Sequence, residues 1–149
     1  MRARNAAIVG IGAALVVAAI AIARRKTAVV PPAVESTHAV RIVRRDRVGL
    51  PEKQGTIRDP IRVRSITAAL GIDDLPGAPC PADYADADFG IVLSGSDVYA
   101  KRNVYVYGLL GDAAAPTVVS VTSAGCRVGP PASLPTLRDE LRTAGTLAD

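Results

Sequence analysis

Residues 89–107 read FGIVLSGSDVYAKRNVYVY and predict the centre of a β-sheet. Apolar residues recur at every second position in both halves of the stretch: Phe89, Ile91 and Leu93, then Val104 and Val106. This alternation is typical of strands that bury one face, and Ser94-Gly95-Ser96-Asp97 between them is typical of a turn. Tyr105 and Tyr107 occupy the alternate positions of the second strand.

Other strands and two helices are predicted on either side of this stretch. Residues 38–43 and 117–122 have the composition of strands. Asp59-Pro60 begins a helix whose apolar face is Val63, Ile66 and Leu70, and Gly71 ends it. A second amphipathic helix carries Leu134, Leu137 and Leu141 and stops at Gly145. The predicted fold class is α+β, with two helices packed on a small antiparallel sheet of three or four strands within residues 38–149.

Ahead of this domain lies an apolar stretch, Ala6 to Ala23, of 18 residues without a charged side chain. As a helix it would extend roughly 27 Å, close to the thickness of a bilayer's hydrocarbon core. Residues 1–26 are therefore predicted to be a transmembrane anchor, and residues 27–37, with Pro31-Pro32, an extended linker. Cleavage after Ala21-Ile22-Ala23 is the alternative, which would release a secreted domain.

The charge distribution bears on partners and on orientation. Lys and Arg total 18 against 14 Asp and Glu, but residues 27–149 alone carry 13 basic and 14 acidic side chains. The basic excess thus flanks the apolar stretch, which argues against nucleic-acid binding. Both flanks are positive, so the charge rule alone mildly favours a cytoplasmic C-terminal part. Small residues recur every four positions and would let membrane helices approach closely, although an ordinary alanine- and glycine-rich composition is the preferred interpretation: Ala6, Gly10, Ala14 and Ala18.

The two cysteines, Cys80 and Cys126, lie in loop-like contexts beside predicted strands, and they argue for the opposite orientation. A single pair in an exported domain is typical of a disulfide, and two unlinked buried thiols are the alternative. A bond across this separation would stabilise the fold by about 4 kcal/mol in the chain-entropy model. We therefore expect the domain to lie outside the cytoplasm.

A resemblance points the same way. Cys80-Pro81-Ala82-Asp83 and Gly125-Cys126-Arg127, placed between the two predicted helices, resemble small exported or membrane-anchored domains of actinobacterial type whose function is unknown. The similarity covers residues 55–145 and implies location and fold, but no activity. This chain lacks the lipid-anchoring cysteine of many such proteins.

Few residues suggest chemistry. His38 has no sequence-local partner, and a hydrolase would need it beside Ser94, Ser96 or Ser123 in the fold. Asp83, Asp86 and Asp88 could supply oxygen ligands to Ca²⁺, but their spacing is not that of a known calcium loop, and a solvated acidic loop is the preferred interpretation. No catalytic residue, metal or cofactor is predicted.

A basic segment remains, with Arg41, Arg44, Arg45 and Arg47. It could contact anionic lipid headgroups or an acidic partner, although pairing with the domain's own acidic half is the preferred interpretation. The sequence thus predicts a single-pass membrane protein whose extracytoplasmic domain has a non-enzymatic binding or envelope-structural role, with an exported protein as its partner. A secreted binder or inhibitor, and a hydrolase using His38, are the alternatives.

Overall fold

The computed structural model of this 149-residue chain describes residues 33–47, 49–96, 101–111 and 115–148. They belong to one compact unit, Pro32–Asp149. The predicted membrane segment, with its stripe of small residues and its cleavage position at Ala23, lies outside the described residues.

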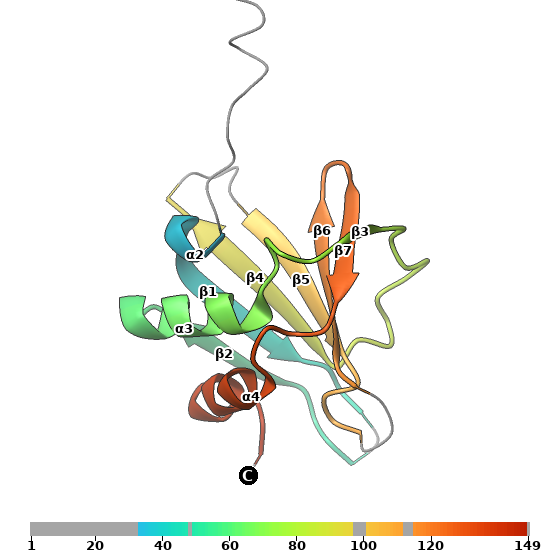
Figure 1. The fold of residues 1–149 in the computed structure, drawn as a ribbon. Helices are drawn as coiled ribbons and strands as arrows, with labels where there is room; N and C mark the ends of the chain where they lie inside the picture. Colours follow the sequence, from blue (N-terminus) through green and yellow to red (C-terminus); the bar gives the residue numbers. More distant parts are fainter. Residues whose placement is uncertain (1–32, 48, 97–100, 112–114, 149) are drawn as a thin grey trace, which may run out of the picture. The chain divides into compact units, whose positions relative to one another are not determined.

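The described chain forms one antiparallel sheet with the strand order β2-β1-β4-β5-β6-β7-β3 (Figure 1). Its strands are β1 (Thr37–Arg44), β2 (Lys53–Ile57), β3 (Gly77–Ala78), β4 (Phe89–Gly95), β5 (Lys101–Tyr107), β6 (Thr117–Thr122) and β7 (Gly125–Gly129). Its helices are α2 (Ala33–Ser36), α3 (Pro60–Leu70) and α4 (Leu134–Thr143). The predicted α+β class and antiparallel pairing are confirmed, with more strands than the three or four expected.

The alternation in residues 89–107 has the predicted effect. Phe89, Ile91 and Leu93 of β4 are buried, and so are their neighbours Val104 and Val106 on β5. Val40 and Ile42 of β1 complete this apolar surface from the other side of β4. The three strands therefore present one continuous apolar face to the helices.

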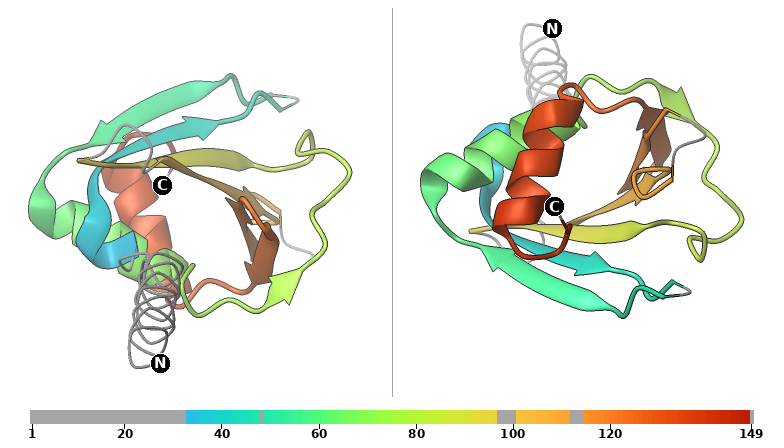
Figure 2. Two further views of the ribbon diagram at one scale, coloured as in Figure 1. Left: turned by 90° about the horizontal axis from the view of Figure 1, so that it is seen from above. Right: turned by 90° about the horizontal axis from the view of Figure 1, so that it is seen from below.

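Local signals place the two larger helices. The Asp59 carboxylate accepts hydrogen bonds from the backbone N–H groups of Ile61 and Arg62, at 3.1 and 2.9 Å, and so caps α3. Gly71 ends α3 with a φ of 63°, in the left-handed region that favours glycine. The buried faces of α3 and α4 include Ile66, Leu70, Leu137 and Leu141. Both helices cover the same face of the curved sheet (Figure 2).

The connection between β3 and β4 crosses to the other face of the sheet. After α3, the chain runs beside β7 as β3, and residues 79–88 then pass on the side away from α4 before entering β4 (Figure 2). We call the face opposite α3 and α4 the outer face. This crossing leaves β5–β7 partly covered on the outer face by residues 79–88, while no described segment packs over β1 and β2 there.

Three local expectations are wrong. The linker predicted for 27–37 is not extended at its end, because Ala33 is buried, α2 is helical and Thr37 already belongs to β1; the Ala33 N–H donates to Asp73 Oδ2 at 2.7 Å. The turn predicted at 94–97 begins later, since Ser94 and Gly95 still pair with β1. Cys126 lies within a strand rather than a loop.

Candidate functional site

A disulfide joins Cys80 to Cys126, with their Cα atoms 5.0 Å apart. The predicted pairing is confirmed, and the chain has no free cysteine. The bond fastens residues 79–88 to β7 next to the β3–β7 pairing, where Ala78 faces Cys126. The path of this segment across the outer face is therefore held covalently at its start.

Tyr84 provides a second attachment of residues 79–88 to the sheet. Its ring stacks on the ring of Tyr105, with centroids 4.1 Å apart and an interplanar angle of 14°. The Tyr84 hydroxyl also lies 3.7 Å from Cys126 Sγ. The stack and the disulfide together hold the middle of the segment against β5.

Asp88 holds the end of the segment. Its carboxylate is buried and accepts hydrogen bonds from the N–H groups of Leu109 and Leu110, at 2.8 and 3.1 Å. Arg47 donates to Asp88 Oδ1 at 3.4 Å and to the Asp86 carbonyl at 2.6 Å. These contacts give Asp88 a structural role at the start of β4.

The three aspartates considered as calcium ligands, Asp83, Asp86 and Asp88, are not brought together as a metal site. Asp83 accepts a hydrogen bond from the Ala85 N–H, and Asp86 is exposed. The Asp88 carboxylate accepts hydrogen bonds from the N–H groups of Leu109 and Leu110 instead. Across the described ranges, no group of three or more His, Cys, Asp or Glu side chains could hold a metal ion.

A groove of about 480 Å³ lies on the outer face, beside residues 79–88. Its floor is a cross-strand row in which Val43 pairs with Gly90, and Gly90 with Tyr105. Because Gly90 has no side chain, the space between Val43 and the Tyr105 ring stays open. The remaining lining residues are Arg45, Asp46, Glu52 and Ala85. We call this cavity the outer groove.

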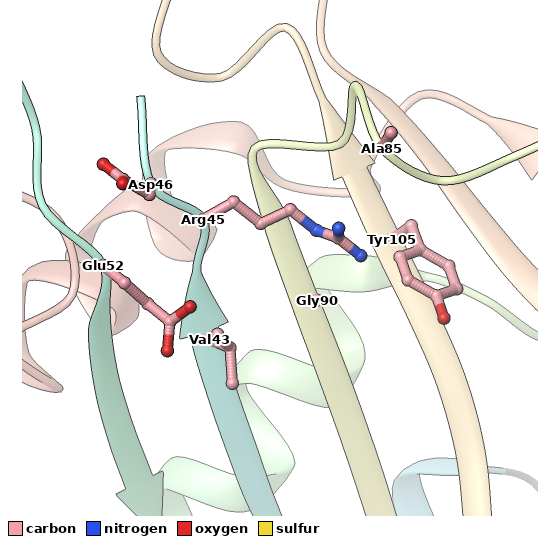
Figure 3. A pocket seen from close by; sticks show the side chains of 7 residues that line it. All are labelled: Val43, Arg45, Asp46, Glu52, Ala85, Gly90 and Tyr105. Carbon is pink, nitrogen blue, oxygen red and sulfur yellow. The ribbon is translucent and has the colours of Figure 1, made fainter. Parts of the chain in front are cut away.

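Charged groups of both signs line the outer groove (Figure 3). The Arg45 side chain extends across Gly90 toward Tyr105, while the Glu52 carboxylate lies near Val43. Among the hydrogen bonds and ion pairs of the described residues, none involves the Arg45 guanidinium or the Asp46 carboxylate. Glu52 accepts one hydrogen bond, from Gln54 Nε2 at 2.9 Å. The groove therefore presents a cation and two carboxylates with unused capacity for hydrogen bonding.

Tyr107 lies on the same strand as Tyr105. Its hydroxyl oxygen is buried and has no hydrogen-bond partner among the described residues. Burial, with smaller contributions from Tyr84 and Asp83, raises the pKa of Tyr107 above its ordinary value of 10.0. Tyr107 is thus a neutral phenol under the segment that walls the outer groove.

The four arginines of the basic segment do not form one surface in the fold. Arg44 is separate from the other three, because Arg44 follows Val40 and Ile42 on the inward face of β1 and is only 2% exposed. Its guanidinium donates to the carbonyls of Pro51 and Thr146, at 2.6 and 3.1 Å.

The other three arginines of the basic segment differ in their surroundings. Arg47 is engaged by Asp86 and Asp88 as described above. Arg41 is exposed on the outer face and donates to Gln54 Oε1 at 3.1 Å. Arg45 alone of the four lines the outer groove.

His38 lies elsewhere, at a second cavity. It is exposed and lines this cavity with Val34, Glu35, Thr37, Pro60 and Arg64. None of the described hydrogen bonds joins His38 to Ser94, Ser96 or Ser123. The geometry that the hydrolase hypothesis needs is therefore missing from this arrangement, and that hypothesis gains no support.

Sequence reasoning missed the outer groove. The alternation of β5 did indicate that Tyr105 faces away from the core. Residues Glu52, Ala85 and Gly90, however, come from three separate segments. No local sequence pattern predicts that these three residues lie together in the fold.

In the part of the chain that the structure describes, no helix combines the length and apolar character needed to cross a membrane. Comparisons with models of protein families, with curated proteins and with solved structures found no match.

Proposed function

We propose that this chain is a single-pass membrane protein whose extracytoplasmic domain binds a ligand or partner and catalyses no reaction. The disulfide between Cys80 and Cys126 carries the proposal. Structural disulfides persist in oxidising compartments and are rare in the cytoplasm. The apolar stretch from Ala6 to Ala23 supplies a segment long enough to anchor such a domain.

The outer face supports a binding role. The outer groove is open and lined by charged and aromatic side chains, and the wall formed by residues 79–88 is fastened by the disulfide and the Tyr84–Tyr105 stack. A fixed wall reduces the ordering cost of binding. The proposal assigns the recognition surface to this groove.

A thiol count on the membrane fraction of intact cells tests the location. Free thiols are labelled with a maleimide–polyethylene glycol reagent under denaturing conditions, with and without prior reduction. The number of labels is then read from the shift of the band on a gel. We expect a shift equivalent to two labels only after reduction. A Cys80→Ser variant, which takes one label without reduction, calibrates the shift. Two labelled thiols in the unreduced wild-type chain would contradict an extracytoplasmic location.

The alternative is a secreted domain released after Ala23, for which Ala21-Ile22-Ala23 is the supporting feature. The basic residues that follow, Arg24-Arg25-Lys26, favour retention. Sequencing the N-terminus of the mature protein separates the two. If protein recovered from the medium begins at Arg24, the domain is secreted, and the proposal of a membrane anchor is wrong.

A further inference from the structure

The three charged groups of the outer groove do not neutralise one another. No ion pair among the described residues joins Arg45 to Asp46 or Glu52. Figure 3 shows the reason: the Arg45 guanidinium is directed toward Tyr105, and the Glu52 carboxylate lies on the β2 side of Val43. The groove thus has a cationic end and an anionic end, separated by the uncharged floor of Val43 and Gly90.

Backbone hydrogen bonds fix the position from which the Arg45 side chain extends. The Arg45 N–H donates to the carbonyl of Asp88 at 2.9 Å, and the Asp88 N–H donates to the carbonyl of Val106 at 2.8 Å. Asp88 is itself fixed by its bonds to Leu109 and Leu110. The base of the Arg45 side chain is therefore part of the hydrogen-bonded sheet, although its guanidinium makes no hydrogen bond or ion pair with any described residue.

The charged side chains of the outer groove favour some classes of ligand and disfavour others. A polyanion such as a nucleotide would bring several negative charges close to Asp46 and Glu52, which repel it. An uncharged sugar could offer hydroxyl groups to these side chains, but it would supply no counter-charge to either end of the groove. A molecule with a carboxylate at one end and ammonium groups at the other satisfies both ends of the groove. Guanidinium is the protein group best suited to a carboxylate, because it can donate two parallel hydrogen bonds.

We propose that the outer groove binds a short peptide with a free carboxylate and free ammonium groups. The carboxylate pairs with Arg45 and an ammonium group pairs with Glu52, while the peptide's apolar part lies on Val43, Gly90 and the Tyr105 ring. Because the groove carries one cation and two carboxylates, it favours a peptide with more ammonium groups than carboxylates. This assignment rests on the proposed binding function and names its ligand class.

Lysyl-alanine is the probe, titrated into the full-length chain in detergent with the disulfide intact and followed by ligand-observed nuclear magnetic resonance. Its size implies a dissociation constant on the order of 1 mM. Amidation of its carboxylate should weaken binding to the wild type by about tenfold, and Arg45→Gln should weaken lysyl-alanine binding equally. Amidation should then have no further effect on the Arg45→Gln variant. Glu52→Gln should weaken binding while the preference for a free carboxylate remains.

Arg41→Gln is the matched control, because Arg41 is an exposed arginine on the same face of β1 that does not line the groove. We expect Arg41→Gln to bind as the wild type does, and glutamyl-alanine to bind more weakly than lysyl-alanine. Equal losses in Arg41→Gln and Arg45→Gln would overturn the assignment, since they would indicate an unspecific charge effect. Absence of binding, or equal binding of the amidated probe, would also overturn it.

The proposed extracytoplasmic function and the proposed peptide ligand can be contradicted independently of each other. If the thiol count shows an oxidised domain in the membrane fraction while lysyl-alanine does not bind, only the ligand class is wrong. If the cysteines are reduced in the cell, the extracytoplasmic function is wrong, whatever the peptide titration shows.

Discussion

Arg44 and Tyr107 illustrate how polar groups are accommodated at single positions of this fold. Arg44 is buried among apolar neighbours, and two backbone carbonyls accept from its guanidinium, although its Nε has no partner in the described structure. These two hydrogen bonds link the segment after β1 to the chain after α4. Tyr107 has a buried hydroxyl for which no hydrogen bond is described. The two residues therefore differ in what a substitution would remove.

Tyr107→Phe should leave the free energy of unfolding at pH 7 within about 0.5 kcal/mol of the wild type, because no described hydrogen bond is lost. At higher pH the free energies of unfolding of the wild type and of Tyr107→Phe should differ. Burial raises the pKa of Tyr107 in the folded chain, so as the pH passes its ordinary value of 10.0 the unfolded chain releases the proton first. The wild type should therefore lose more stability than the variant above pH 10.0.

Urea denaturation of both chains, at neutral pH and in alkaline buffer, measures this difference. A loss of more than about 1 kcal/mol in Tyr107→Phe at pH 7 would show that the hydroxyl is bonded after all.

The helices differ in how their N-termini are capped. Asp59 accepts hydrogen bonds from two backbone N–H groups at the start of α3. Ser133 occupies the equivalent position of α4, but its hydroxyl donates to the Thr136 hydroxyl at 2.9 Å and makes no capping bond. The second helix is held by its apolar face, since Leu137 and Leu141 are fully buried.

Asp59→Ala should therefore lower the free energy of unfolding by about 1 kcal/mol, because two N–H groups at the start of α3 lose their acceptor. Ser133→Ala is the matched control and should cost clearly less. Chemical denaturation followed by far-ultraviolet circular dichroism gives both values. Equal losses in the two variants would mean that the Asp59 cap adds nothing to stability.

Secondary structure followed local patterns where those patterns are strong. β1, β4, β5 and β6 were predicted from alternation or composition, and α3 and α4 from helical spacing and their end signals. β2 was missed because its sequence, KQGTI, has one buried apolar residue, Ile57, and forms an edge of the sheet. β3 and β7 are short and contain glycine, so only their pairing with each other and with β6 defines them.

For the molecule as a whole, the disulfide connects parts of the chain that are 46 residues apart. It closes a loop containing β4, β5 and β6, the centre of the sheet. It also fastens the wall of the outer groove. Loss of the bond should therefore affect global stability and the groove together.

Replacing both cysteines by alanine should lower the free energy of unfolding by about 4 kcal/mol, since the unfolded chain regains the entropy of an open loop. Urea denaturation of the oxidised wild type and the double variant measures the loss. The wild type reduced before denaturation should behave like the double variant. A difference below about 1 kcal/mol would show that the bond does not stabilise the fold.

The sequence by itself determined the α+β class, the central strands, the two larger helices and the pairing of Cys80 with Cys126. Alternation, helical spacing and capping are local properties, and two cysteines allow a single intramolecular bond. Only the tertiary structure decided that Arg44 enters the core while Arg45 lines a groove, and that Glu52, Gly90 and Tyr105 meet there. Those placements depend on strand register and on the path of residues 79–88 across the outer face, and contacts between distant segments set both.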